Sequence, residues 1–146
     1  MTDNHRPLSI ALRILGLIDL LALFAVIMPR RWMEEGSVWA GLGPLPEGSL
    51  VGYLARSASV LYALHGGLIL FISFDVERYW RLITFLAIAA LVHALLMLGI
   101  DLVEGMPTWW TLLEPPGFVA TGAIVLILQR RGYDRHKQLY RISRSL

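Results

Sequence analysis

The amino-acid sequence predicts an all-α integral membrane protein, a four-transmembrane-helix bundle with a short interfacial helix in the first outer loop and another before span four. Of the 146 residues, 56% are hydrophobic and only 16% are charged, whereas soluble domains carry about a quarter charged residues. The chain also holds four apolar runs, each close to the roughly 20 residues that a membrane-crossing helix needs. We therefore expect one transmembrane domain over residues 1–146, with a basic cytoplasmic tail over residues 132–146.

The first apolar run covers residues 8–28 and ends at Pro29, which two arginines follow. Residues 29–49 then mix tryptophans with glutamates and close in a Gly/Pro-rich stretch. Tryptophan gathers at the depth of the lipid headgroups, and clusters of glycine and proline mark turns. We expect a short interfacial helix followed by a turn in this segment.

The second and third spans are expected over residues 50–74 and 82–103. Only the polar residues 75–81 separate these two apolar runs. A connection this short joins antiparallel neighbours. The sequence therefore predicts that the second and third helices lie side by side.

The fourth span is the least regular, because Glu114-Pro115-Pro116-Gly117 interrupts its pattern. Proline is tolerated in the first turn of a helix and disrupts the interior. We therefore expect a short surface helix near residues 107–113 and a span over residues 115–131.

The distribution of basic residues predicts that both termini are cytoplasmic. Cytoplasmic segments are enriched in lysine and arginine, and the loop 101–114 contains acids but neither basic residue. With the N-terminus inside, nine basic residues are cytoplasmic and three are outside. The nine are Arg6, Arg78, Arg81, Arg130, Arg131, Arg135, Lys137, Arg141 and Arg144, and the three are Arg30, Arg31 and Arg56. The lack of cysteine and of targeting signals suits a bacterial inner membrane. The expected partner of the basic tail is anionic lipid and not nucleic acid.

The residue inventory excludes several kinds of chemistry. There are no cysteines, which rules out disulfides, thiolate metal sites, iron–sulfur clusters and cysteine nucleophiles. The chain also lacks a phosphate-binding loop, a dinucleotide fingerprint and a zinc-protease motif. No cofactor is predicted, and a non-enzymatic role is favoured over an enzymatic one.

Three ionisable residues fall near the middle of the predicted spans, namely Asp19, His65 and His93, and Tyr62 shares a helix face with His65. An ionisable side chain inside a membrane is costly, so each is a functional hypothesis. The favoured interpretation is hydrogen bonding between helices, which fixes the bundle. The alternatives are an intramembrane redox, metal, haem or proton-handling site, or a pocket for a small lipophilic ligand.

A second polar group is expected at the outer ends of the spans. Its members are Arg56, Asp101, Glu104 and Glu114. In the functional interpretation they form a polar mouth that leads down to the histidines. In the structural one, which is favoured, Arg56 pairs with one of the acids. A carboxylate partner for Arg56 is expected in both cases.

Small residues recur at four-residue spacing along the second span, at Ala55, Ser59, Ala63 and Gly67. Such a stripe lets membrane helices approach closely. We expect it to serve bundle packing, a homo-oligomer or contact with another membrane protein. The sequence therefore favours a small multi-pass protein with a non-catalytic accessory or assembly role.

Overall fold

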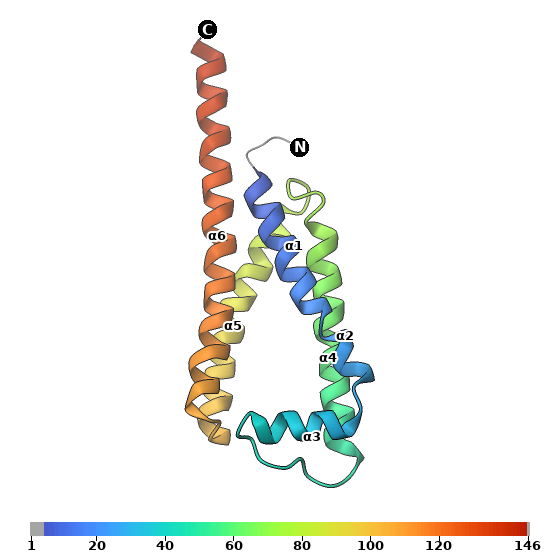
Figure 1. Cartoon of the computed structure of the whole chain (residues 1–146). Helices are drawn as coiled ribbons and strands as arrows, with labels where there is room; N and C mark the ends of the chain where they lie inside the picture. The colour runs from blue at the N-terminus through green and yellow to red at the C-terminus, as the bar shows by residue number, and fades with distance from the viewer. Residues whose placement is uncertain (1–4, 146) are drawn as a thin grey trace. The chain divides into compact units, whose positions relative to one another are not determined.

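The computed structural model describes residues 5–145, with side chains as far as Gly132. Apart from Gly132, the side chains of the predicted tail at 132–146 thus lie outside the described residues. Figure 1 shows the helices in chain order. They are α1 (Arg6–Leu20), α2 (Leu23–Ile27), α3 (Arg30–Trp39), α4 (Ser49–Ile72), α5 (Trp80–Glu104) and α6 (Thr108–Ser145).

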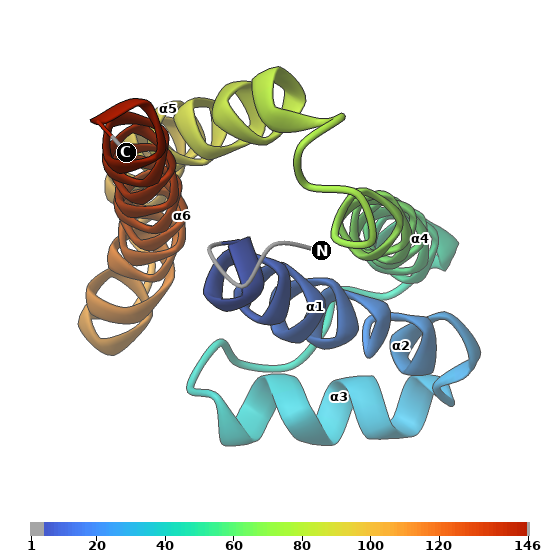
Figure 2. The ribbon, with the colours of Figure 1, turned by 90° about the horizontal axis from the view of Figure 1, so that it is seen from above.

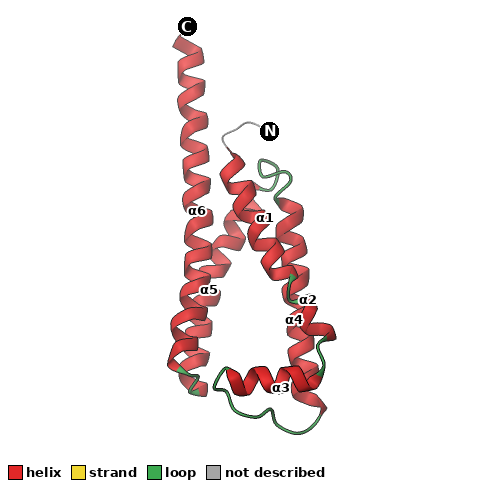
Figure 3. Ribbon diagram, in the orientation of Figure 1, coloured by secondary structure: helices red, strands yellow, loops and turns green. Residues whose placement is uncertain are grey.

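Four helical stretches are long and apolar enough to cross a membrane. They are Arg6–Ile27, Ser49–Ile72, Trp80–Glu104 and Thr108–Gly132. The bounds of α4 and α5 lie within two residues of the predicted second and third spans. The all-helical fold class is thereby confirmed for the part of the chain that the structure describes, where no strand occurs (Figure 3).

The chain divides into two compact units. The first, which we call the α5–α6 unit, contains residues 1–13 and 71–146, and the second, the α3–α4 unit, contains residues 14–70. Helix α1 contributes its beginning to the first unit and its end to the second.

In the α5–α6 unit, the two long helices run antiparallel and side by side (Figure 1). Gly105 makes the reversal possible, because it ends α5 with a φ of 65°, a left-handed conformation that suits glycine. The backbone N–H groups of Gly105 and Met106 both donate to the carbonyl of Asp101. The last turn of α5 is capped in this way, and α6 begins three residues later.

Helices α5 and α6 approach each other closely at Gly122, and the buried residues of both helices recur at spacings of three, four and seven. A Cβ at Gly122 would lie 2.7 Å from the carbonyl oxygen of Ala87, so only glycine fits there. Spacings of this kind keep one face of each helix toward its neighbour. The buried positions are Ile83, Ala87, Ala94 and Asp101 on α5, and Pro115, Gly122, Val125, Gln129 and Gly132 on α6.

The beginning of α1 also belongs to the α5–α6 unit. The Ser9 hydroxyl, which is 2% exposed, donates to the carbonyl of Ser73 at 2.7 Å. The His5 ring stands edge-on to Trp80, with 5.6 Å between ring centroids. The first two turns of α1 are therefore held by residues that lie more than 60 positions later in the chain.

Helix α6 corrects the expected division of the fourth span. The sequence predicted a separate surface helix at 107–113, but α6 runs unbroken from Thr108 through Pro115 and Pro116. Each proline lacks an N–H and so removes the hydrogen bond to the carbonyl four residues earlier, which usually ends a helix.

Two features accompany the prolines of α6. Pro115 is buried, so that packing favours the continuous helix. The indole N–H of Trp110 donates to the carboxylate of Glu114 at 2.6 Å, which links consecutive turns just before the prolines. Membrane helices can retain internal proline, because neighbouring helices, side chains and local backbone adjustments satisfy the freed backbone groups.

In the α3–α4 unit, α3 runs across the direction of α4. Figure 2 looks nearly along α4 and shows α3 lying across the view. The helix that the sequence predicted after Pro29 is therefore present, at Arg30–Trp39, and none of its residues is buried.

The first candidate span, Arg6–Ile27, is broken in its second half, which the sequence did not predict. Helix α1 ends at Leu20 and α2 starts at Leu23. Between them, the backbone N–H of Ala22 donates to the carbonyl of Asp19 at 3.1 Å, a tighter three-residue turn. Leucine and alanine are strong helix formers, so local helix preference does not account for this break.

Candidate functional site

Helices α1 and α4 meet backbone to backbone at two glycines of the α3–α4 unit. A Cβ at Gly16 would lie 2.8 Å from the carbonyl oxygen of Gly66, and a Cβ at Gly66 would lie 2.7 Å from that of Gly16. Real Cβ atoms essentially never come this close to another atom. The crossing therefore requires glycine on both helices, as close contacts of membrane helices often do.

This crossing brings two ionisable side chains together. Asp19 follows Gly16 by three residues, and His65 directly precedes Gly66. The Nδ1 atom of His65 lies 2.8 Å from the Oδ2 atom of Asp19, which is both a hydrogen bond and an ion pair when the ring is protonated. The glycine contact thus positions the pair.

The Asp19–His65 pair leaves one ring nitrogen available. An ionised carboxylate only accepts hydrogen bonds, so Nδ1 of a neutral ring donates and the lone pair lies on Nε2. The side chain of His65 is 49% exposed, against 28% for Asp19. The imidazole is therefore held by the carboxylate on one side and open on the other.

The pair also lies next to the break in the first span. The carbonyls of Ile18 and Asp19 accept three-residue hydrogen bonds from Leu21 and Ala22, at the point where α1 ends. Interruptions of this type in helices often mark functional positions. Asp19 therefore combines an ionisable side chain bonded to His65 with a backbone carbonyl that takes part in the tight turn after α1.

The other two members of the predicted midplane cluster are placed as follows. Tyr62 lies one turn before His65 on α4 and is 39% exposed. His93 belongs to the α5–α6 unit, where its ring stands edge-on to Phe118 with 4.5 Å between centroids. The structure thus brings Asp19 and His65 together, and the meeting of both with His93 stays a prediction.

A metal site needs more ligands than this pair supplies. Neither unit gathers three histidine or carboxylate side chains in a ligand set within its described residues. A metal held by Asp19 and His65 would need further ligands, because protein sites commonly use three or four.

Arg56 is held by backbone carbonyls of its own unit rather than by the expected carboxylate. Its guanidinium donates to the carbonyls of Val26 and Met28 at 3.0 Å each, and to that of Gly52 at 3.5 Å. Val26 and Met28 lie at the end of α2, where helix carbonyls lack intrahelical donors. The guanidinium of Arg56 therefore caps the end of the first candidate span. These carbonyls take the place of the carboxylate that the sequence predicted as its partner.

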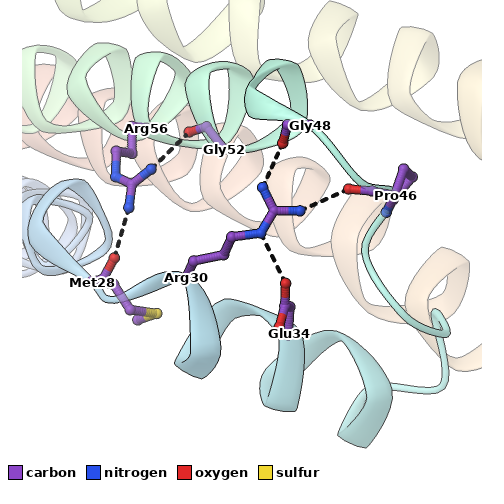
Figure 4. A network of polar contacts seen from close by, with 7 residues as sticks. All are labelled: Met28, Arg30, Glu34, Pro46, Gly48, Gly52 and Arg56. Atoms are coloured by element: carbon purple, nitrogen blue, oxygen red, sulfur yellow. Dashed lines mark hydrogen bonds and ion pairs between the residues drawn. The ribbon is translucent and has the colours of Figure 1, made fainter.

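Arg30 makes a second group of contacts nearby (Figure 4). Its guanidinium donates to the carbonyls of Gly48 and Pro46 and to the carboxylate of Glu34. These bonds join the start of α3 to the loop that precedes α4. The sequence analysis treated Arg30 only as an outer charge and missed this role.

We expect replacement of Arg56 by glutamine to destabilise the protein by about 1–3 kcal/mol, the usual cost of leaving buried polar groups without partners. Glutamine is too short to reach both carbonyls of α2. Thermal unfolding in detergent micelles measures the effect.

Arg31→Gln is the matched control for Arg56→Gln. The Arg31 side chain is 85% exposed and its guanidinium pairs with Glu35 on the same helix, an interaction worth about 0.5 kcal/mol or less. Equal losses in the two variants would show that the cap at the end of α2 contributes nothing.

The three outer acids belong to the α5–α6 unit. Asp101 is 2% exposed, and its Oδ2 atom has no hydrogen-bond partner within the described residues. Glu114 accepts the indole N–H of Trp110, and Glu104 is exposed at the end of α5. Their grouping with Arg56 into a polar mouth stays a prediction.

The predicted packing stripe and the observed glycine contact differ by one residue. Ala63 is 5% exposed, whereas Ala55 is exposed and a Cβ at Gly67 would meet nothing within 4 Å. The Ser59 hydroxyl donates to the carbonyl of Ala55, within the same helix. The close approach to α1 is made by Gly66 instead.

The sequence analysis missed Gly16 and Gly66 as positioning residues. A usable signal was present, because each glycine lies within one turn of an ionisable residue in an apolar helix.

Comparison with known proteins finds no family model, curated protein or solved structure that matches the chain. Function is therefore inferred from the residues and their geometry alone.

Proposed function

We propose that this chain is a four-span integral membrane protein with both termini in the cytoplasm, and that it binds and releases a proton at the Asp19–His65 pair. Four long apolar helices and the uneven distribution of arginine support the topology. The orientation of α3 across α4, with no buried residue, supports a position for α3 at the outer membrane surface.

The observation that supports proton binding most directly is the 2.8 Å contact between Nδ1 of His65 and Oδ2 of Asp19. Both residues lie at least seven residues from the ends of their spans, which is about 10 Å along a helix axis. Ionisable groups at this depth pair with one another and commonly mark proton relays.

The chemistry of the pair suits reversible protonation. A proton that arrives at Nε2 converts the ring to imidazolium, while Nδ1–H stays bonded to the carboxylate. The negative carboxylate stabilises the positive ring, and the pair then has no net charge. When the proton leaves Nε2, the neutral ring returns without any change in its position.

Nitrogen NMR of histidine in lipid nanodiscs tests the proposal. We expect the His65 signal, identified by its loss in His65→Gln, to change reversibly with pH between neutral and protonated ring states. We also expect a downfield Nδ1–H proton, because hydrogen bonds to a charged acceptor are short and strong. In Asp19→Asn that proton should move upfield.

A His65 ring that keeps one protonation state wherever the protein stays folded would overturn the proposal. In that case the contact is a structural bond between α1 and α4. That result would favour the accessory or assembly role that the composition suggests.

A further inference from the structure

The polar side chains of α4 are arranged at a constant spacing. Between Leu50 and Ile72, every side chain that can form a hydrogen bond lies three residues from the next, with Ser57 as the exception. The five residues of this polar row are Tyr53, Arg56, Ser59, Tyr62 and His65.

Residues three apart are neighbours on a helix surface, with about 5–6 Å between their Cβ atoms. Such residues form one of the continuous ridges along which side chains follow one another. The polar row therefore joins the Ser49 end of α4 to His65. It stops there, because the next two positions at this spacing are Leu68 and Phe71.

The members of the row are accessible within the structure. The exposed fraction is 67% for Tyr53 and 39% for Tyr62, and 49% of the His65 side chain is exposed. Ser59 donates its hydroxyl proton to the carbonyl of Ala55 at 2.8 Å. Its oxygen keeps two lone pairs that accept further hydrogen bonds.

Arg56 is part of the row by position but not by its contacts. Its guanidinium is directed to the carbonyls of Val26 and Met28. Arginine also stays protonated in proteins and passes no proton on. Arg56 therefore separates Tyr53 from the rest of the row, and the groups that can exchange protons with His65 are the hydroxyls of Ser59 and Tyr62.

We propose that Ser59 and Tyr62 conduct protons between water at the Ser49 end of α4 and Nε2 of His65, so that His65 is reached from that end alone. This inference rests on the proposed protonation of His65. The proposed route lets protons reach His65 only from the Ser49 end of α4.

The transfer balances at each hydroxyl. A hydronium ion that reaches Ser59 from the Ser49 end gives one proton to the oxygen of Ser59. That oxygen releases its own proton to the Tyr62 oxygen, and Tyr62 releases its proton to Nε2 of His65. Each hydroxyl is restored, and the net change is one proton moved from water to the imidazole.

Time-resolved infrared spectroscopy after a rapid pH jump tests this route in nanodiscs. The band that disappears in His65→Gln reports protonation of His65. We expect Tyr62→Phe and Ser59→Ala to slow its appearance by about a hundredfold, the low end of what a positioned proton donor contributes. The final amplitude should stay as in the unmodified protein.

Ser57→Ala is the matched control, because Ser57 is on the same helix but outside the row. Its rate should equal that of the unmodified protein. If His65 becomes protonated equally fast in all these variants, the route is wrong although the proton site stands. If His65 is never protonated in the unmodified protein, both proposals fail.

Discussion

Replacement of Gly66 by alanine is expected to separate α1 from α4 and to break the Asp19–His65 contact. The added Cβ would lie 2.7 Å from the carbonyl oxygen of Gly16 and 2.8 Å from the backbone nitrogen of Leu20. Both are main-chain atoms, so no side-chain rotation relieves the overlap. Overpacking typically costs about 1–3 kcal/mol, and we expect this loss in thermal unfolding in detergent.

The same variant should change the site more than it changes the fold. Once the helices separate, the downfield Nδ1–H proton of His65 should disappear from the NMR spectrum although both side chains of the pair are intact. A loss of stability without this spectral change would contradict a positioning role for Gly66.

Gly67→Ala provides a matched control on the same helix. A Cβ at Gly67 would meet nothing within 4 Å, and alanine favours a helix over glycine by up to about 1 kcal/mol. We expect unchanged or slightly higher stability and an unchanged His65 signal. An effect as large as that of Gly66→Ala would show that the helices tolerate no added methyl group anywhere in this region.

The second large effect is expected when the pair is dismantled one residue at a time. His65→Leu leaves the Asp19 carboxylate without its partner inside the span, which we expect to cost about 2–3 kcal/mol, the range for a lone charge at the centre of a membrane helix. The double variant Asp19→Leu, His65→Leu removes both groups. Its stability should return to within about 1 kcal/mol of the original, because hydrogen bonds between membrane helices contribute little net stability.

Chemical unfolding of the four proteins in mixed micelles completes this double-mutant cycle. Proton binding at the site should be lost in both single variants and in the double variant. If His65→Leu is as stable as the original, the carboxylate does not depend on the ring, and the pair is not a coupled unit.

The helices were predictable because the apolar runs that form them are long. A run of about 20 apolar residues has few alternatives to a helix, and the polar turn at 75–81 marks the end of one helix and the start of the next. The two departures occur where local sequence signals do not account for the structure. Pro115 and Pro116 lie inside α6, and the leucine-rich first candidate span breaks after Leu20.

The candidate site was predictable in its residues but not in its packing. The sequence singles out Asp19 and His65, because ionisable groups are conspicuous in apolar helices. It does not fix the rotation of one helix against another, and one residue along a helix turns the contact face by about 100°. The expected stripe through Gly67 and the observed contact at Gly66 differ by this single step.

The bond between Ser9 and the carbonyl of Ser73 has a consequence for the order of assembly during synthesis. Residues 14–70 of the α3–α4 unit are contiguous, so that unit is complete as soon as α4 has been translated. The beginning of α1 must wait for a partner that the ribosome adds 64 residues later. The beginning of α1 is thus synthesised before α4 but acquires these native neighbours only after α4 is complete.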